Sequence, residues 1–138
     1  SLEGRQSVVK ESKSLRSAQA DGILLRDTLF ELRAVSQLCH PNIIRFEGVG
    51  VDFESDPWVG LVFEYRGEGS LYEALHLNRV IVQSLQKVNI ACGVAAALDY
   101  LHSRFYLHLD VNSKNVMLDG AMSPKLADFG CSAAADRR

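Results

Sequence analysis

The chain has 138 residues, of which 47% are hydrophobic and 23% are charged, a composition typical of one soluble globular domain or part of a larger one. The formal net charge of -2 argues against nucleic acid and anionic membrane as partners, although a local basic patch stays open. No apolar run approaches the ~20 residues that span a bilayer. The three cysteines show no metal-ligand spacing, which favours reduced thiols in a cytosolic compartment.

The first part of the chain predicts a strand and then a helix. Residues 7–13 carry an apolar pair before Lys10 and predict a short strand. Apolar residues then recur at helical spacing over residues 23–38, with Asp21 as a plausible N-cap. The stripe consists of Thr28, Leu32, Val35 and Leu38 or Cys39. Pro41 ends this helix, because a residue before proline avoids the α region.

The middle of the chain predicts two strands and two helices. Residues 43–51 and 58–65 are rich in bulky and branched side chains, with a polar hairpin loop between them. Ser70 and Glu73 have the spacing of a capping box at the start of a short helix. A long helix follows over about residues 84–102. Its expected buried stripe is Leu85, Val88, Ala91 or Cys92, Ala95 and Leu98. Strands and long helix segregate along the chain, which favours an α+β fold.

The last predicted element is an apolar hairpin with polar residues at its open end. A turn centred between residues 121 and 122 pairs Asn115 with Asp128 across that end. Asn and Asp are poor strand formers, so local propensity does not explain them there. Two facing oxygen ligands suit Mg²⁺, which takes one or two carboxylates together with phosphate oxygens. Asp110 supplies a further carboxylate, which fits a general base.

Each of these residues also has a plainer interpretation. Asp110 alone is more often a turn cap, and Asn115 and Asp128 alone are more often loop ends. Lys10 alone is more often a solvated lysine at a strand end, and Glu31 alone is more often a helix surface residue in a weak surface ion pair. The combination of these residues, rather than any one of them, favours a functional site.

The stretch HLDVNSKN resembles the catalytic loop of protein kinases, and ADFG resembles the D-F-G motif that follows it. The resemblance implies that Asp110 accepts the proton of the substrate hydroxyl and that Asn115 and Asp128 hold Mg²⁺. SVVK resembles the strand that carries the ATP-binding lysine, which implies that Lys10 contacts the phosphates and that Glu31 is its ion-pair partner.

The run LVFEYRGEGSL resembles the kinase hinge. The resemblance implies that Phe63 lies behind the adenine, that Glu64 and Arg66 offer backbone groups to its edge, and that Met117 packs beneath the ring. It also implies an apolar stack that links two lobes, formed by His108, Phe129, Val35 and Phe46. HPNIIRFEGVG and EGSLYEAL are most similar to the tyrosine-kinase-like and plant receptor-like branch, which mostly modifies serine and threonine.

The implied architecture is a two-lobe, protein-kinase-like α+β fold that is truncated at both ends. Residues 1–65 would belong to the small lobe, 66–69 to the hinge and 70–138 to the large lobe. No glycine-rich loop precedes Lys10 and no A-P-E motif follows the D-F-G. We therefore expect these 138 residues alone not to phosphorylate protein, and we expect the long helix to leave an apolar face uncovered.

Two positions depart from the family pattern. Leu109 replaces the catalytic-loop arginine that pairs with a phosphorylated activation loop, which implies no ordering of that kind. Asn112 stands where serine/threonine members carry a lysine that stabilises charge on the transferring phosphoryl group. An amide can donate a hydrogen bond there but adds no charge, and losing one preorganised donor costs on the order of 10²–10³ in rate. These departures predict a slow kinase or a pseudokinase.

The resemblance thus implies a serine/threonine-type protein kinase that uses ATP and Mg²⁺, with Lys10, Glu31, Asp110 and Asn112 as catalytic residues. Its partner would be a protein substrate rather than nucleic acid, and this chain shows no membrane segment. The location would be cytoplasmic, or the cytoplasmic side of a membrane receptor. The alternatives are a pseudokinase that binds nucleotide or a partner protein without turnover, and a truncated product with no activity.

Overall fold

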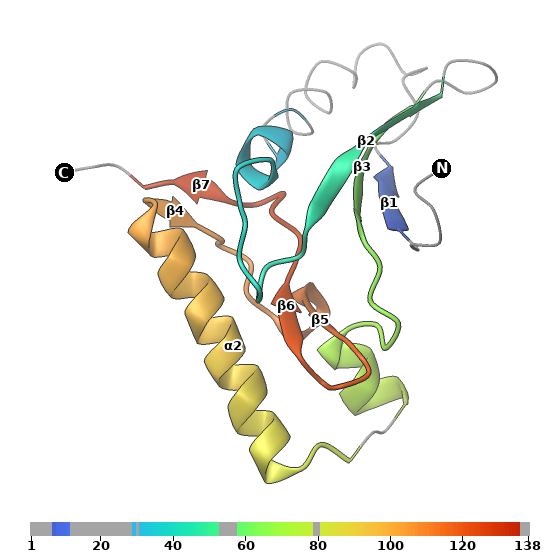
Figure 1. Ribbon diagram of the computed structural model, residues 1–138, viewed down its shortest axis with the longest axis vertical. Coiled ribbons are helices and arrows are strands. Elements are labelled where there is room, and N and C mark those ends of the chain that lie inside the picture. The colour runs from blue at the N-terminus through green and yellow to red at the C-terminus, as the bar shows by residue number, and fades with distance from the viewer. Residues whose placement is uncertain (1–6, 12–28, 30, 53–57, 79–80, 136–138) are drawn as a thin grey trace. The chain divides into compact units, whose positions relative to one another are not determined.

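The computed structural model describes residues 7–11, 29, 31–52, 58–78 and 81–135 (Figure 1). The chain divides into two compact units. Unit 1 consists of Ser1–Leu38 and Arg45–Tyr65, and unit 2 consists of Cys39–Ile44 and Arg66–Arg138. Each unit has strands and a helical segment, so the α+β class expected from the sequence is confirmed.

Unit 1 is built on an antiparallel sheet of three strands. These are β1 (Ser7–Glu11), β2 (Phe46–Asp52) and β3 (Trp58–Glu64), in the order β1-β3-β2. Residues 29 and 31–35 are helical. Leu61 and Phe63 of the central strand are buried, as are Ala34 and Val35 of the helix. The central strand thus contributes its apolar side chains to the core of this unit.

The strand predicted over residues 43–51 begins later than expected. Ile43 forms a bridge with Leu126, and the Ile44 N–H donates to the Leu126 carbonyl at 2.9 Å, so both residues belong to unit 2. The backbone of residues 43–44 therefore pairs with Leu126, at the end of the hairpin, before β2 starts. The predicted N-cap Asp21, the stripe residue Thr28 and the hairpin loop at 53–57 lie outside the described residues.

The short helix after Arg66 begins at the predicted capping box. The Glu73 carboxylate accepts the Ser70 N–H at 2.7 Å, and the Ser70 hydroxyl oxygen accepts the Glu73 N–H at 3.2 Å. The backbone and hydroxyl hydrogen bonds from Ser70 lower the pKa of Glu73. Residues 71–72 are α-helical, and the chain then widens into the π-helix η1 (Glu73–Leu77). The capping box thus fixes where this helix starts.

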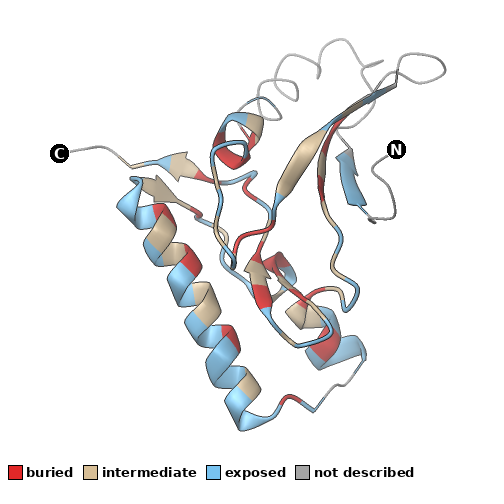
Figure 2. Cartoon of the chain, viewed as in Figure 1, coloured by how far each residue is buried: buried red, intermediate tan, exposed pale blue. Residues whose placement is uncertain are grey.

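The long helix α2 (Ser84–Ser103) is present, but its predicted buried stripe is wrong. Leu85 is 70% exposed and Val88 is 56% exposed, and Ala91, Cys92 and Ala95 are exposed as well. The buried residues are Ile90, Ala97 and Leu101 (Figure 2). The face with the small residues Gly93 and Ala97 packs inward, because small side chains let the helix come close to its neighbours.

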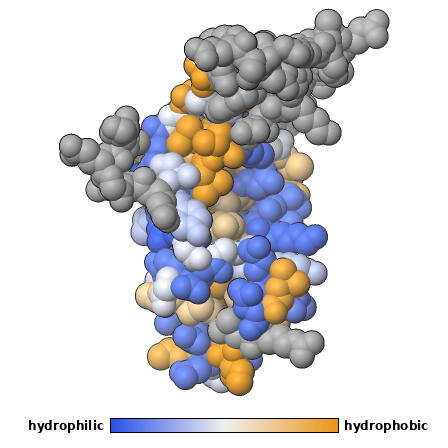
Figure 3. Space-filling model, turned by 90° about the vertical axis from the view of Figure 1, so that its right-hand side faces the viewer, coloured by the Kyte–Doolittle hydropathy of each residue, from blue (hydrophilic) through white to orange (hydrophobic). Residues whose placement is uncertain are grey.

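The opposite face of α2 borders an apolar groove within unit 2. The groove has a volume of about 650 Å³. Its walls are formed by α2, by residues 71, 75 and 82 around η1, and by the loop at residues 111–113. The lining residues are Leu71, Leu75, Val82, Lys87, Ile90, Ala91, Val94, Ala95, Leu98, Val111, Asn112, Ser113 and Val116. Figure 3 shows a different side of the molecule, the one on the right of Figure 1, where hydrophobic and hydrophilic side chains are both present at the surface. The uncovered apolar face expected for the long helix is thus present.

The hairpin of unit 2 forms with a register one residue away from the prediction. Its strands β5 (Val116–Leu118) and β6 (Pro124–Leu126) pair Val116 with Leu126 and Met117 with Lys125. The turn centres on Ala121, because the Asp119 carboxylate accepts the N–H groups of both Ala121 and Ser123. The predicted pairing of Asn115 with Asp128 was therefore wrong.

Three further short elements belong to unit 2. Strands β4 (Tyr106–Leu107) and β7 (Ala133–Ala134) pair with each other, and the 3-10 helix η2 (Ser113–Asn115) precedes the hairpin. Helix α2 runs alongside β4 and β6 (Figure 1). The loop from His108 to Asn112 is thus fixed by a strand before it and a helical turn after it.

Candidate active site

In unit 1, an ion pair joins the first strand to the helix. The Lys10 ammonium lies 2.9 Å and 3.0 Å from the two carboxylate oxygens of Glu31. Glu31 is only 6% exposed, whereas the side chain of Lys10 is 44% exposed. A buried carboxylate is costly unless it is paired, so Glu31 holds the ammonium group at the sheet while one side of it stays open to solvent. This is the pair that the sequence predicted.

In unit 2, the carboxylate of Asp110 is held by two amide side chains. The Asn115 side-chain N–H donates to Asp110 Oδ2 at 2.8 Å and to the Asp110 carbonyl at 2.9 Å. The Asn112 side-chain N–H donates to Asp110 Oδ1 at 2.9 Å. A carboxylate has about four acceptor positions. Both oxygens of Asp110 are thus fixed in place and can still accept one more hydrogen bond each.

Asn112 also organises the turn that follows Asp110. Its side-chain oxygen accepts the Lys114 N–H at 2.9 Å, which caps helix η2. Lys114 itself extends toward the Tyr72 ring, with its ammonium 5.1 Å from the ring centroid. The position where the family carries a lysine therefore holds a side chain that points back into its own loop.

Asp128 follows directly after the last hydrogen bond of the hairpin. The Ala127 N–H donates to the Asn115 carbonyl at 2.8 Å, which brings the backbone of Asn115 next to the residue before Asp128. Asp128 has a φ of 61° and Leu109 has a φ of 65°. Left-handed backbone is unfavourable for a leucine, and such strained residues cluster at functional sites. Two of them flank the Asp110 loop and the hairpin end.

His108 forms the buried support of this loop. Its side chain is 2% exposed, and its ring packs edge-on against Phe129 at a centroid distance of 4.9 Å. Nδ1 accepts the Asp110 N–H at 3.3 Å, which leaves Nε2–H to donate to the Ala127 carbonyl at 3.0 Å. Burial lowers the pKa of His108, despite the opposing effects of the Ala127 carbonyl, Asp110 and Asp128. A neutral histidine thus connects the two loops.

An ion pair absent from the sequence predictions connects the segment after the sheet to the hairpin turn. Arg66 Nη1 lies 2.9 Å from Asp119 Oδ2. Burial alone would raise the pKa of Asp119, but hydrogen bonds from Ser123 and Ala121, together with Arg66, outweigh that effect and lower it. The Leu118 N–H also donates to the Gly69 carbonyl at 2.8 Å. Residues 66–69 are thus tied to the hairpin that carries Met117.

The other predicted nucleotide contacts are placed as follows. Phe63 is buried and packs edge-on against Phe46 in unit 1, with ring centroids 5.9 Å apart. The Glu64 N–H donates a hydrogen bond to the Arg45 carbonyl at 3.0 Å. In unit 2, Met117 is half-buried on β5 and forms a bridge with Ser70. Of the predicted apolar stack, His108 and Phe129 meet in unit 2, whereas Val35 and Phe46 lie in unit 1.

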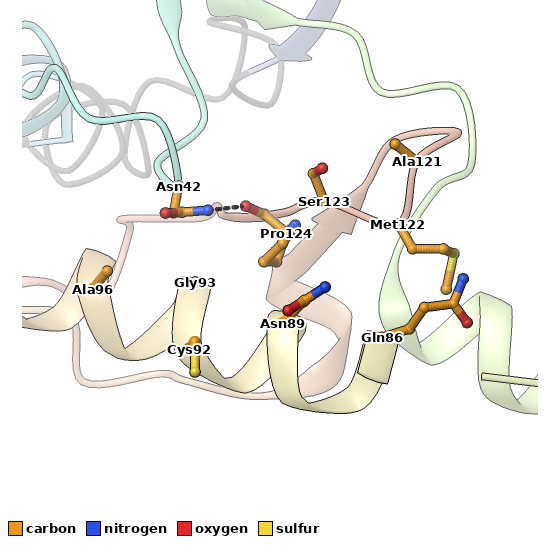
Figure 4. Close-up of a pocket in the computed structure, with 10 residues that line it drawn as sticks. All are labelled: Asn42, Gln86, Asn89, Cys92, Gly93, Ala96, Ala121, Met122, Ser123 and Pro124. Atoms are coloured by element: carbon orange, nitrogen blue, oxygen red, sulfur yellow. Dashed lines mark hydrogen bonds between the residues drawn. The ribbon is translucent and has the colours of Figure 1, made fainter. Parts of the chain in front are cut away.

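A second hollow of unit 2 lies between α2 and the hairpin turn (Figure 4). Its volume is about 430 Å³, and every side chain that lines it is uncharged. Gly93 lies at its base, where an added Cβ would come within 2.5 Å of Pro124 Cγ and 2.8 Å of Asn42 Nδ2. The Asn42 side chain donates to the Pro124 carbonyl at 3.0 Å. The glycine therefore allows the helix to approach the hairpin closely.

The family model for protein tyrosine and serine/threonine kinases matches residues 3–138. The chain belongs to the protein kinase family. It is 40% identical over 109 residues to Salt tolerance receptor-like cytoplasmic kinase 1 of Oryza sativa subsp. japonica, an alignment that covers 72% of this chain and 29% of that protein. It is 32% identical over 131 residues to Ephrin type-B receptor 2 of Gallus gallus, covering 95% of this chain and 13% of that protein.

A third relative is Mitogen-activated protein kinase kinase kinase 13-B of Xenopus laevis, at 35% identity over 102 residues, covering 74% of this chain and 10% of that protein. The chain thus spans less than a third of the length of these relatives. The family match supports the kinase-like α+β fold and a phosphotransferase by resemblance. Both serine/threonine and tyrosine kinases belong to the family so described.

The donor set of unit 2 fits a magnesium ion that also takes phosphate oxygens. Within the described ranges, three or more His, Cys, Asp or Glu never gather into a group that could hold a metal. Mg²⁺ does not require one, since one or two protein ligands are typical when phosphates and water complete its shell. Asn115 uses its amide N–H groups on Asp110, which leaves its side-chain oxygen for a metal.

The remaining sequence expectations concern cysteines and membranes. The three cysteines, Cys39, Cys92 and Cys131, are free and exposed. Among the residues that the structure describes, we find no helix long and apolar enough to cross a membrane.

Proposed function

We propose that the chain supplies the phosphate-orienting and catalytic-loop residues of a protein kinase that transfers the γ-phosphoryl group of ATP to protein hydroxyls. The observation that carries the proposal is the Asp110 carboxylate, held at 2.9 Å and 2.8 Å by the Asn112 and Asn115 amides. A carboxylate fixed in this way, with acceptor positions left over, is suited to receive a proton from a substrate hydroxyl. The resemblance of HPNIIRFEGVG and EGSLYEAL to the tyrosine-kinase-like and plant receptor-like branch favours serine and threonine as acceptors.

In the proposed reaction, the substrate oxygen forms a bond to the γ-phosphorus while the bond from that phosphorus to the β–γ bridging oxygen breaks. ADP leaves with that oxygen, and the proton of the attacking hydroxyl passes to Asp110. Lys10, held by Glu31, neutralises and orients the ATP phosphates. Asn115 and Asp128 would hold Mg²⁺, which neutralises charge on the β- and γ-phosphates when it is bound. Most of the rate enhancement would come from positioning and electrostatics.

Nucleotide recognition is part of the same proposal. Phe63 would lie behind the adenine, Met117 would pack beneath it, and backbone groups of Glu64 and Arg66 would meet its edge. The Arg66–Asp119 pair supports this assignment for unit 2, because it fixes the backbone of residue 66 relative to the strand of Met117. A cytoplasmic location, or the cytoplasmic side of a receptor, follows from the need for ATP.

The second candidate is a pseudokinase that binds nucleotide without turnover. Leu109 and Asn112 favour it, because neither contributes the positive charge that the family pattern places there. Leu109 is 63% exposed and offers no hydrogen-bonding group to an activation segment. The two candidates differ in turnover but share the nucleotide site.

The deciding experiment compares ATP binding with ATP turnover in the native gene product that contains these residues. The kinase proposal expects Asp110→Asn to keep Mg²⁺-dependent ATP binding and to lose about 10²–10⁴-fold in phosphate transfer, the contribution of a general base. Gln37→Glu, an exposed change in unit 1, should leave transfer intact. ATP binding with no transfer by the unsubstituted protein would select the pseudokinase, and no ATP binding would refute both.

A further inference from the structure

The side chain of Asn112 makes two kinds of contact. Its side-chain N–H groups donate to Asp110 Oδ1 at 2.9 Å and to the Asp110 carbonyl at 3.3 Å. Its side-chain oxygen accepts the Lys114 N–H at 2.9 Å. An asparagine amide offers two donors and one oxygen acceptor. Both donors and the oxygen are thus used within the same loop.

These contacts connect the carboxylate of Asp110 to the helical turn that carries Asn115. Asn112 caps η2 through its oxygen, and η2 ends at Asn115, whose own amide holds the other oxygen of Asp110. The carboxylate plane is therefore defined from both sides by groups on one short segment. A lysine at position 112 could donate to Asp110 but could not accept the Lys114 N–H, because its ammonium group has no acceptor.

We infer that Asn112 is a positioning residue that orients the carboxylate of Asp110, and that it does not act on the transferring phosphoryl group. The inference rests on the proposed function and assigns the amide a different task from the lysine of the family pattern. The half-buried carboxylate of Asp110 would be held at Oδ2 alone without Asn112, and a reacting group that is misplaced by about 1 Å can lose ~10² in rate. The Asn112 donor fixes Oδ1 as well.

A purely structural role for Asn112 makes a different prediction. If the residue only caps η2, any side chain that accepts the Lys114 N–H should replace it, and serine is a good helix cap. Serine is too short to keep the contact with Asp110 Oδ1 as well. Alanine removes both contacts. Serine and alanine at position 112 thus separate the cap from the contact with Asp110, without adding charge.

The test measures kcat, the KM for ATP and thermal unfolding of the native gene product with Asn112→Ser and Asn112→Ala. We expect kcat to fall about 10- to 100-fold in both variants with the KM for ATP nearly unchanged, the loss typical of a misplaced group. The unfolding midpoint should fall in Asn112→Ala only. The matched control is Asn89→Ala, an exposed amide on α2, which should change neither quantity. Recovery of the unsubstituted kcat by Asn112→Ser would overturn the inference.

A spectroscopic readout decides the inference even if the protein shows no turnover, in which case the kinase proposal alone fails. In the ¹H–¹⁵N spectrum, Asp110→Ala should shift the side-chain amide resonances of Asn112 and leave those of Asn89 in place. Asn112 resonances that do not respond to Asp110→Ala would overturn the positioning role. If the Asn112 resonances shift clearly but the protein shows no turnover, the positioning role is supported and the proposed kinase reaction is refuted.

Discussion

The two units hold their charged groups in different ways. In unit 1, Lys10 and Glu31 come from a strand and a helix that are far apart in sequence, and Lys10 keeps a 44% exposed side chain. In unit 2, Asp110 is held by amides of Asn112 and Asn115, which follow it within one loop. The first arrangement depends on tertiary packing, whereas the second is set by local chain geometry. Changes in unit 1 should therefore affect function through the placement of elements, and changes in unit 2 through the loop itself.

The largest effect is expected from breaking the ion pair of unit 1. Glu31→Gln leaves the Lys10 ammonium without its buried counter-charge, so the phosphates of ATP lose an oriented partner. We expect kcat/KM for ATP to fall ~10²-fold, the cost of misplacing a substrate-orienting group. Steady-state kinetics of the native gene product at fixed protein substrate would measure it.

The control for this change is a second ion pair of the same unit, in which Arg45 Nη2 lies 2.8 Å from Glu47 Oε1. Arg45→Gln should leave kcat/KM within about twofold of the unsubstituted value, since the Arg45 side chain pairs with Glu47, which has no role in the proposed site. Equal losses in Glu31→Gln and Arg45→Gln would show that the effect is not specific to the Lys10 partner.

In unit 2, the close contact of α2 with the hairpin should be sensitive to one added methyl group. Gly93→Ala places a Cβ 2.5 Å from Pro124 Cγ, and the overpacking should lower the free energy of unfolding by ~1–3 kcal/mol. This loss opposes the ~1 kcal/mol that alanine normally adds in a helix. Urea unfolding measures the difference.

Gly48→Ala is the comparison for that variant, because nothing lies within 4 Å of its added Cβ. We expect it to change stability far less. If Gly93→Ala were as stable as the unsubstituted protein, the helix and the hairpin would have to be free to separate.

The ion pair between Arg66 and Asp119 offers an effect of similar size that depends on pH. Asp119→Asn removes the charge from a carboxylate that accepts two backbone N–H groups, and we expect a loss of ~1–3 kcal/mol at neutral pH. The pKa of Asp119 is lowered in the folded protein. The charged carboxylate therefore stabilises the fold fully at pH values above ~3.9, the ordinary pKa of Asp. This stabilisation is lost as the pH falls through the folded pKa.

The direction of this pH dependence is tested by measuring the free energy of unfolding of the unsubstituted protein and of Asp119→Asn at pH 7 and again at acid pH. The difference between the two proteins should shrink toward acid pH. A difference that grows as the pH falls would contradict the assignment of a lowered pKa to Asp119.

The smallest expected effect is the titration of His108. Its folded pKa lies below its ordinary value, so the folded protein binds fewer protons than the unfolded chain does. The free energy of unfolding should therefore be highest above pH ~6.5, the ordinary pKa of His, and should decrease as the pH falls toward the folded pKa. Urea midpoints at pH 7.5 and pH 5.5 measure the decrease.

His108→Gln should abolish the pH dependence between those two values, whereas His76→Gln, an exposed change on η1, should keep it. A pH dependence that survives in His108→Gln would assign it to another group. This test thus shows whether His108, the buried support of the Asp110 loop, titrates as the structure implies.

Much of the site was predictable because it depends on local chemistry. The spacing of Ser70 and Glu73 predicted the capping box, which the structure contains. The ion pair of Lys10 and Glu31 was implied by motif resemblance and not by local chemistry. Motif resemblance supplied the roles of Asp110, Asn115 and Asp128, which remain proposals. The capping box and the catalytic-loop motif each involve a few neighbouring residues, so the sequence carries them directly.

Two of the failed predictions depend on contacts between distant parts of the chain, whereas the hairpin register depends on a contact within the turn itself. The hairpin register shifted because the Asp119 carboxylate organises the turn around Ala121, a contact that spacing alone does not reveal. The stripe of α2 was misplaced because small residues face the hairpin while Leu85 stays exposed. The partner of Arg66 was missed because Asp119 is distant in sequence, although an aspartate before glycine at a hairpin turn was a signal for a turn-organising carboxylate.

The most direct test of the account is the rate of γ-phosphate transfer to protein as a function of Mg²⁺ in the native gene product and in its Asp128→Asn variant. The account predicts transfer that requires Mg²⁺ and a far higher Mg²⁺ requirement, or no transfer, when Asp128 loses its charge. Transfer with the same Mg²⁺ dependence in both proteins would contradict the proposal that the end of the hairpin holds the metal of a phosphoryl-transfer site.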